Sequence, residues 1–154
     1  MSQQPFALRS RRVIIDAGEQ SATVVIADGR INSVIDYAAV PDCPVEDLGD
    51  KVLMPGLVDT HVHINEPGRT EWEGFNTATQ AAAAGGITTV VDMPLNCTPV
   101  TTTANALRQK LDALGDQLWV DCGFWGGVVP DNLDDLEELL RAGVLGVKSF
   151  TIHS

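Results

Sequence analysis

The sequence has few basic residues and no long apolar run. Lys and Arg number 10 against 21 Asp and Glu, which gives a formal net charge of −11. Such a chain lacks the clustered cations that neutralise phosphates, so we do not expect it to bind nucleic acid or an anionic membrane surface. It also lacks any run of about 18 apolar residues, so we expect no membrane-spanning helix.

Cysteine is also scarce. Cys43, Cys97 and Cys122 lie far apart and form no C-x-x-C pair, and an odd number without a framework is typical of reduced thiols. The segment from Met1 to Pro5 leads to several arginines without an apolar stretch, so we expect no secretory signal. With 44% hydrophobic and 20% charged residues, the composition predicts a soluble, globular protein of the cytoplasm.

Residues 1–52 contain short β-branched runs that are separated by turn signals. These runs cover residues 12–15, 21–26 and 30–35. Asp28-Gly29 lies between the last two runs, and such a pair is typical of a tight β-hairpin. We therefore expect residues 1–52 to form a small, antiparallel, β-rich segment.

From residue 53 onward, strand-like and helix-like segments alternate. The expected strands begin near residues 53, 87, 118 and 144. The expected helices cover residues 70–84, 103–114 and 131–140. Strict alternation predicts βαβ units and a parallel sheet, and the glycine-rich turn of a Rossmann fold is absent after the first strand. Since a complete (β/α)8 barrel takes about 250 residues, we expect residues 53–154 to form its first four strands.

His61 and His63 lie at the carboxyl end of the first of these strands. Residues two apart on a strand point to the same face, and this end of a barrel is its catalytic face. Two imidazoles on one face suit a divalent metal, although a bare H-x-H pair also arises by coincidence. Asp59 shares that face, where it is either a carboxylate that orients the histidines or a loop or capping residue.

Lys148 lies within an apolar strand-like run. A buried lysine is costly unless it is neutral or paired, and two interpretations follow. It is a snorkelling or edge lysine, or it is a desolvated nucleophilic amine that adds carbon dioxide. The resulting carbamate would act as a carboxylate-like ligand that bridges two metals about 3.5–4 Å apart.

Three segments together carry a family resemblance. They read HVHINEPGRTEWEGF over 61–75, GITTVVDMPLN over 86–96 and GVKSF over 146–150. This ordered set resembles the cyclic-amidohydrolase branch of the amidohydrolase superfamily and, within that branch, the allantoinases. The resemblance implies that His61 and His63 are metal ligands and that Lys148, as N6-carboxylysine, bridges two divalent ions. Zinc is the first expectation, with cobalt, iron or manganese as alternatives.

The resemblance also implies an activity. The family would hydrolyse the ring amide of allantoin to allantoate with a metal-bridged hydroxide, in purine and ureide catabolism. Two further histidines and the general-base Asp of the family would come from later strands, beyond Ser154. We therefore expect no general base within this chain, no activity from the 154 residues alone, and a homo-oligomer acting on a small molecule in the full-length form. Residues 1–52 would be part of a composite β domain.

Substrate choice depends on the residues beside the histidines. Asn65 stands where dihydroorotases usually have an Arg that binds the substrate carboxylate. An amide suits allantoin, which has no carboxylate, but a turn role beside Pro67-Gly68 is equally open. Asn96 is likewise either a substrate contact or a turn residue. His153 lies five residues after Lys148 and would face the opposite side of a strand, so we do not expect it to be a ligand.

Two other functions remain as alternatives at this stage. The first is a hydantoinase or dihydropyrimidinase that acts on another cyclic amide. The second is a non-catalytic protein of the same fold that is kept for assembly. Such a protein would be expected to lose its metal residues, whereas His61, His63 and Lys148 are all present.

Overall fold

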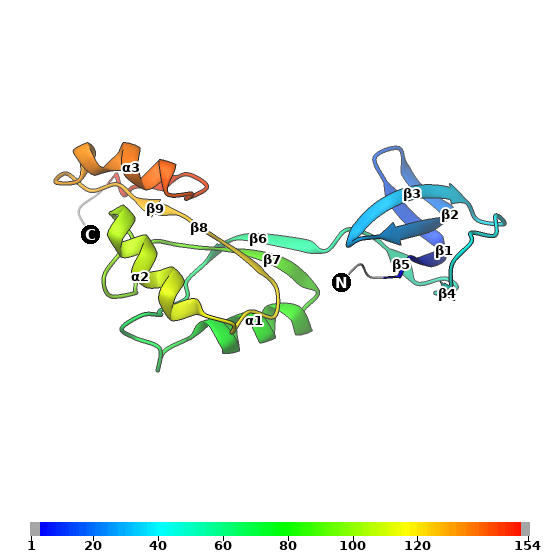
Figure 1. The fold of residues 1–154 in the computed structure, drawn as a ribbon, viewed down its shortest axis with the longest axis horizontal. Helices are drawn as coiled ribbons and strands as arrows, with labels where there is room; N and C mark the ends of the chain where they lie inside the picture. The colour runs from blue at the N-terminus through cyan, green and yellow to red at the C-terminus, as the bar shows by residue number, and fades with distance from the viewer. Residues whose placement is uncertain (1–3, 152–154) are drawn as a thin grey trace. The chain divides into compact units, whose positions relative to one another are not determined.

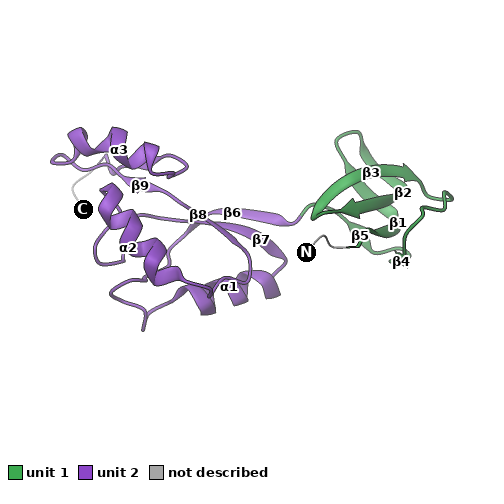
Figure 2. Ribbon diagram, viewed as in Figure 1, with its two compact units in different colours: residues 1–55 green, residues 56–154 purple. Residues whose placement is uncertain are grey.

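The computed structural model describes residues 4–151. It divides into two compact units, Met1–Pro55 and Gly56–Ser154 (Figure 2). The division follows Pro55 because the short strand β5 (Val52–Leu53) pairs with the first strand of the first unit. Within the described residues, no helix is long and apolar enough to cross a membrane.

The first unit is a five-stranded sheet. Its strands are β1 (Phe6–Ile15), β2 (Gly18–Ala27), β3 (Arg30–Asp36), β4 (Val45–Asp47) and β5. Strands β1, β2 and β3 are antiparallel, as the sequence predicts, whereas β4 and β5 run parallel to β1. Asp28 (φ 50°) and Gly29 (φ 71°) both adopt left-handed backbone angles between β2 and β3, which is the geometry of the tight hairpin that an Asp-Gly pair favours.

The second unit alternates strands and helices (Figure 1). Its elements are β6 (Leu57–Val62), α1 (Phe75–Ala84), β7 (Ile87–Asp92), α2 (Ala104–Leu114), β8 (Asp121–Phe124), β9 (Gly126–Gly127), the 3-10 turn η1 (Leu133–Asp135), α3 (Leu136–Arg141) and β10 (Val147–Lys148). Strands β6, β7 and β8 form a parallel sheet in that order. This is the βαβ arrangement that the alternation predicts.

The first strand of this unit is shorter than expected. The apolar run that begins at Leu53 is divided at Pro55-Gly56, so Leu53 pairs in the first unit and β6 begins at Leu57. Gly56 lies so close to Thr88 that a Cβ on Gly56 would come within 2.1 Å of the threonine Oγ1. Only glycine lets the chain enter β6 along this path.

Helix α1 begins at Phe75 rather than at the expected Thr70. The preceding residues form turns in which the Arg69 N–H donates to Asn65 O over 3.0 Å and the Trp72 N–H donates to Arg69 O over 2.9 Å. The helix ends where Gly85-Gly86 predicts, because Gly86 adopts φ 81°, which the preceding helical backbone cannot continue.

The last two expected elements are also shorter. The helix expected over 131–140 is divided into η1 and α3, and the strand expected from Val144 is reduced to β10. Strand β10 pairs with β9, and the Leu145 N–H donates to Phe124 O over 2.9 Å. The fourth strand, β10, therefore lies beside the segment that continues β8. Trp125 separates β8 from β9 along the chain.

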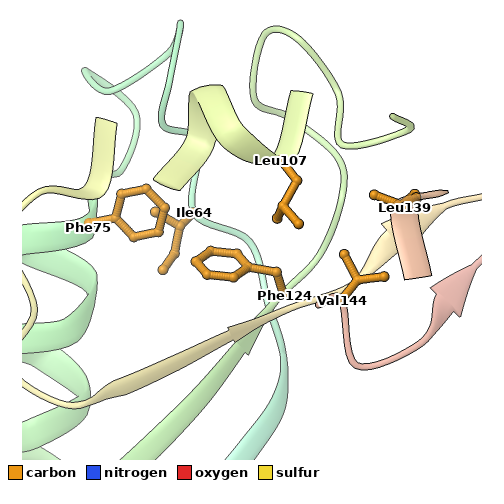
Figure 3. Packing of buried hydrophobic residues seen from close by; sticks show 6 residues of the cluster. All are labelled: Ile64, Phe75, Leu107, Phe124, Leu139 and Val144. Carbon is orange, nitrogen blue, oxygen red and sulfur yellow. The ribbon is translucent and has the colours of Figure 1, made fainter. Parts of the chain in front are cut away.

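One apolar core joins the helices to the carboxyl ends of these strands. Its buried members are Ile64, Phe75, Leu107, Phe124, Leu139 and Val144 (Figure 3). The rings of Phe75 and Phe124 meet edge to face, with centroids 6.2 Å apart, which is a favoured aromatic geometry. Because Ile64 directly follows His63, this core anchors the chain at the candidate site.

Candidate metal site

His61 and His63 lie together at the carboxyl end of β6. His61 is within the strand, and His63 follows its last residue. Both side chains are exposed, their ring centroids are 5.5 Å apart, and their planes are inclined by 47°. Imidazole rings that approach each other in this way offer two nitrogen donors to one ion.

A bulge in β6 places His61. Asp59 lies opposite Val90 of β7, and Val62 lies opposite Asp92, so the register shifts between these two pairs. Bulges bend a strand locally and redirect a side chain. Asp59 Oδ1 accepts a hydrogen bond from the His61 N–H over 3.0 Å. This contact agrees with the interpretation of Asp59 as a capping residue, because the carboxylate binds a backbone amide.

The surroundings of His63 favour its neutral form. Partial burial lowers the pKa of His63, and the positive charges of His61, Lys148 and Lys110 lower it further. A neutral imidazole is the form that binds a metal. Asn96 Nδ2 lies 3.4 Å from His63 Nδ1, and Asn96 has a left-handed φ of 66°. Asn96 is therefore a turn residue whose side chain also lies at the site.

Lys148 lies in β10 and is half-buried. Its Nζ lies 4.8 Å from the centroid of the Phe150 ring, a cation–π distance. Its charge acts on the pKa of His63, so the two side chains are within electrostatic range. His153 lies outside the described residues.

The donor chemistry fits part of a divalent metal site. Two imidazoles and a lysine that can become a carbamate supply the nitrogen and oxygen donors that zinc-like ions accept. Between residues 4 and 151, no group of three or more His, Cys, Asp or Glu residues comes together in a way that could hold an ion. His61, His63 and Lys148 thus remain candidate ligands.

Of the two interpretations of Asn65, the structure shows the turn role. Its N–H donates to Glu73 O over 2.9 Å and its carbonyl accepts from Arg69 N–H, so its backbone belongs to the turn. Its side chain is buried, with the residue 8% exposed, and Oδ1 has no hydrogen-bond partner among the described residues. A buried acceptor without a partner costs about 1–3 kcal/mol.

A buried ion pair behind the histidines was not predicted from the sequence. Lys110 of α2 pairs with Asp92 at the end of β7, and each residue is 1% exposed. Burial raises the pKa of Asp92 to about 6, because lost solvation outweighs the charge of Lys110 and the hydrogen bonds that the carboxylate accepts. The available signal was Lys110 within the apolar face of α2, which includes Leu107.

Comparisons with known proteins agree with these observations. The profile of the Amidohydrolase family matches residues 52–150. A relative named allantoinase from Streptomyces avermitilis is 58% identical over 152 residues, which cover 97% of this chain and 34% of the relative. An allantoinase from Saccharomyces cerevisiae is 48% identical over 159 residues, which cover 96% of this chain and 35% of the relative.

A solved structure shares the fold. The L-hydantoinase (dihydropyrimidinase) from Arthrobacter aurescens superposes with a TM-score of 0.86 at 33% sequence identity, over 99% of this chain and 34% of that one. The chain therefore spans about a third of the length of the relatives it matches. Together the family match and the superposition confirm the expected α/β fold, the first part of an amidohydrolase barrel after a β-rich segment. The chain belongs to the amidohydrolase family.

Proposed function

We propose that this chain carries part of the metal site of an enzyme that hydrolyses a cyclic amide, with allantoin as substrate and allantoate as product. The main support is the pair of imidazoles at the end of β6, with centroids 5.5 Å apart, in a chain of the amidohydrolase family. The 58% and 48% identities to proteins named allantoinase favour allantoin. The structural neighbour named L-hydantoinase supports the broader class of cyclic-amide substrates.

His61 and His63 would hold one divalent ion, and Lys148 would bridge it to a second. Once it has lost its proton to solvent, the Lys148 amine would attack carbon dioxide and form a C–N bond, a second proton would leave the nitrogen, and the carbamate would supply oxygen ligands. Zinc is the first choice, with cobalt, iron or manganese as alternatives. When bound, such an ion pair lowers the pKa of water towards neutrality and polarises the amide carbonyl.

The remaining residues of the site would bind and orient. Asp59 holds the backbone of His61, and the partial burial of His63 lowers the pKa of its ring and so favours the neutral form that binds metal. The unpaired Oδ1 of Asn65 would accept an N–H of the substrate, which has ring and ureido amides but no carboxylate. Asn96, beside His63, is placed to contact the same ligand.

We also propose that these 154 residues do not complete the catalytic site. The family resemblance implies that further histidines and a general base come from other strands. The same resemblance supports a homo-oligomer. The three free cysteines favour a reducing compartment, and we propose the cytoplasm.

The test is metal content and allantoin hydrolysis in the protein that carries this chain. His61→Ala and Lys148→Ala should each lower bound metal from about two ions per subunit and abolish ring opening. Thr60→Ala, an exposed neighbour on β6, is the matched control and should change neither. Full metal content and activity in Lys148→Ala would contradict the bridging role. Turnover of hydantoin or dihydrouracil without turnover of allantoin would contradict allantoin as the substrate.

A further inference from the structure

The segment that carries both histidines is bonded to buried residues of the second unit. The structure assigns the task of holding it to the buried Asp92–Lys110 pair: we propose that Asp92, held by Lys110, is a positioning residue that fixes the backbone next to His63 and thereby sets the metal affinity of the histidine pair. This inference rests on the proposed metal site.

The main contact is made by one carboxylate oxygen. Asp92 Oδ1 accepts a hydrogen bond from the Ile64 N–H over 2.6 Å, and Asp92 Oδ2 pairs with the Lys110 ammonium. Ile64 directly follows His63, and its side chain is buried in the core at 1% exposure. Ile64, the residue after His63, is therefore held in two ways: Asp92 binds its backbone N–H, and the apolar core surrounds its side chain.

Two further contacts hold the same segment on either side of His61. The Met93 N–H donates to Val62 O over 2.8 Å, and the indole Nε1–H of Trp125 donates to Thr60 O over 2.9 Å. Thr60 and His61 lie within the bulged part of β6, where the ladder does not pair them regularly. The indole gives the Thr60 carbonyl a partner where the bulge interrupts the ladder, and the Met93 bond belongs to the regular pairing that resumes at Val62.

The backbone of Asp92 is also bonded to the backbone of Trp125. The backbone N–H of Trp125 donates to the backbone O of Asp92 over 2.9 Å. Asp92 therefore contacts both Ile64, through its side chain, and Trp125, whose indole binds Thr60. The main-chain contact with Trp125 remains when the side chain of Asp92 is replaced, so a substitution at Asp92 acts on the histidine segment through the Ile64 N–H.

Stability alone is a weak reason for such a pair. Replacement of a buried ion pair by apolar residues of similar volume is often neutral or stabilising, and the surrounding core is apolar, with Phe75, Leu107 and Phe124 among its members. A carboxylate, however, accepts a shorter and stronger hydrogen bond than a neutral group. Lys110 supplies the counter-charge that keeps this acceptor ionised, so the pair is suited to hold a backbone amide in place.

The test separates the acceptor from the charge. Asp92→Asn/Lys110→Met removes both charges and retains an oxygen for the Ile64 N–H, whereas Asp92→Leu/Lys110→Met removes both charges and the oxygen. Each variant is stripped of metal in the protein that carries this chain and checked for folding by circular dichroism. The Zn²⁺ dissociation constant is then measured by competition with a chelator in bicarbonate buffer.

We expect the Asn variant, whose neutral oxygen accepts a weaker hydrogen bond, to bind Zn²⁺ up to about threefold more weakly than the parent protein, and the Leu variant, which has no acceptor, to bind it about 10–100-fold more weakly. Hydrogen exchange of the Ile64 amide should be slow in the parent and in the Asn variant, and fast in the Leu variant. Equal dissociation constants in two folded variants would overturn the proposal.

A second result decides the matter if the Leu variant does not fold. The Asn variant then has to retain both slow exchange at Ile64 and the parent affinity, and a loss of affinity with slow exchange retained would overturn the proposal. Failure of the metal site itself looks different. The parent protein would then show no Zn²⁺ affinity that His61→Ala removes, and that result would overturn both proposals.

Discussion

Glu66 caps helix α1, because its Oε2 accepts a hydrogen bond from the Phe75 N–H over 2.9 Å. Gly74, the residue before the helix, offers no side chain to do so. A Cβ at Gly74 would meet Glu66 Oε2 at 3.0 Å. The carboxylate also lies where the positive end of the helix dipole favours a negative charge. The turn that follows the histidines is thus joined to α1.

Removal of this cap should destabilise the second unit. Glu66→Ala leaves the Phe75 amide without its partner, and we expect it to lower the free energy of unfolding by about 0.5–2 kcal/mol. Glu66→Gln retains an acceptor oxygen and should lose less. Urea unfolding followed by circular dichroism measures both, and equal values for the two variants would show that the hydrogen bond contributes nothing.

Lys110→Met should make stability depend on pH above neutrality. Burial raises the pKa of Asp92 from 3.8 to about 6, so the folded chain binds this proton more tightly than the unfolded chain. This carboxyl therefore lowers the free energy of unfolding as pH rises through that window. Without Lys110 the pKa of Asp92 rises further, and we expect the loss to extend through pH 7 and 8, reaching about 3–5 kcal/mol.

The measurement is urea unfolding of the parent and of Lys110→Met at pH 6, 7 and 8. Asp92→Asn/Lys110→Met is the matched control, since it has no carboxyl to ionise and should be parallel to the parent above pH 6. A Lys110→Met curve that is also parallel to the parent would show that the lysine charge does not act on Asp92.

Gly56→Ala should lower the free energy of unfolding, whereas the same substitution at Gly85 should not. A Cβ at Gly56 would lie 2.1 Å from Thr88 Oγ1 and 2.6 Å from Thr88 Cβ, so β6 and β7 would have to move apart. We expect a loss of about 1–3 kcal/mol from overpacking. Gly85→Ala, whose nearest neighbours lie at 3.5 Å, should be nearly neutral. Thermal melts compare the two, and rescue of Gly56→Ala by Thr88→Gly would identify the clash as the cause.

Asn65→Leu distinguishes a ligand contact from a turn residue. Because Asn65 Oδ1 is buried without a partner among the described residues, its replacement by an apolar side chain of similar size should leave stability unchanged or raise it by up to about 1 kcal/mol. If Oδ1 accepts an N–H of allantoin, KM should rise about tenfold while bound metal stays the same. Unchanged KM with unchanged stability would assign Asn65 to the turn alone.

Local patterns account for much of the fold. Thr103 and Gly115 bound α2 as expected, and Thr103 Oγ1 accepts the Ala106 N–H over 3.1 Å. Helix caps and turns such as Asp28-Gly29 depend on residues a few positions apart, so they are visible in the chain itself. The expectation that His61 and His63 lie close together is of the same kind, because it follows from the two-residue period of a strand, whereas the bulge that places His61 depends on pairing with β7.

Contacts between distant residues account for what the patterns missed. The start of α1 at Phe75 depends on Glu66 and on the turns between them, and the short β10 depends on its pairing with β9. Neither choice follows from the propensity of the residues concerned. Each is settled by which backbone groups find partners once the chain has folded.

The sequence by itself determined the alternation of strands and helices, the tight Asp28-Gly29 turn and the two histidines at one strand end, because each rests on local periodicity and backbone preference. Only the tertiary structure decided that Asp92 reaches Ile64 and Lys110 and that Trp125 reaches Thr60. It also decided that Asn65 buries an unpaired oxygen. Burial and hydrogen bonding across 18 to 65 positions of sequence arise only when separate elements pack together, and that packing holds the histidines in place.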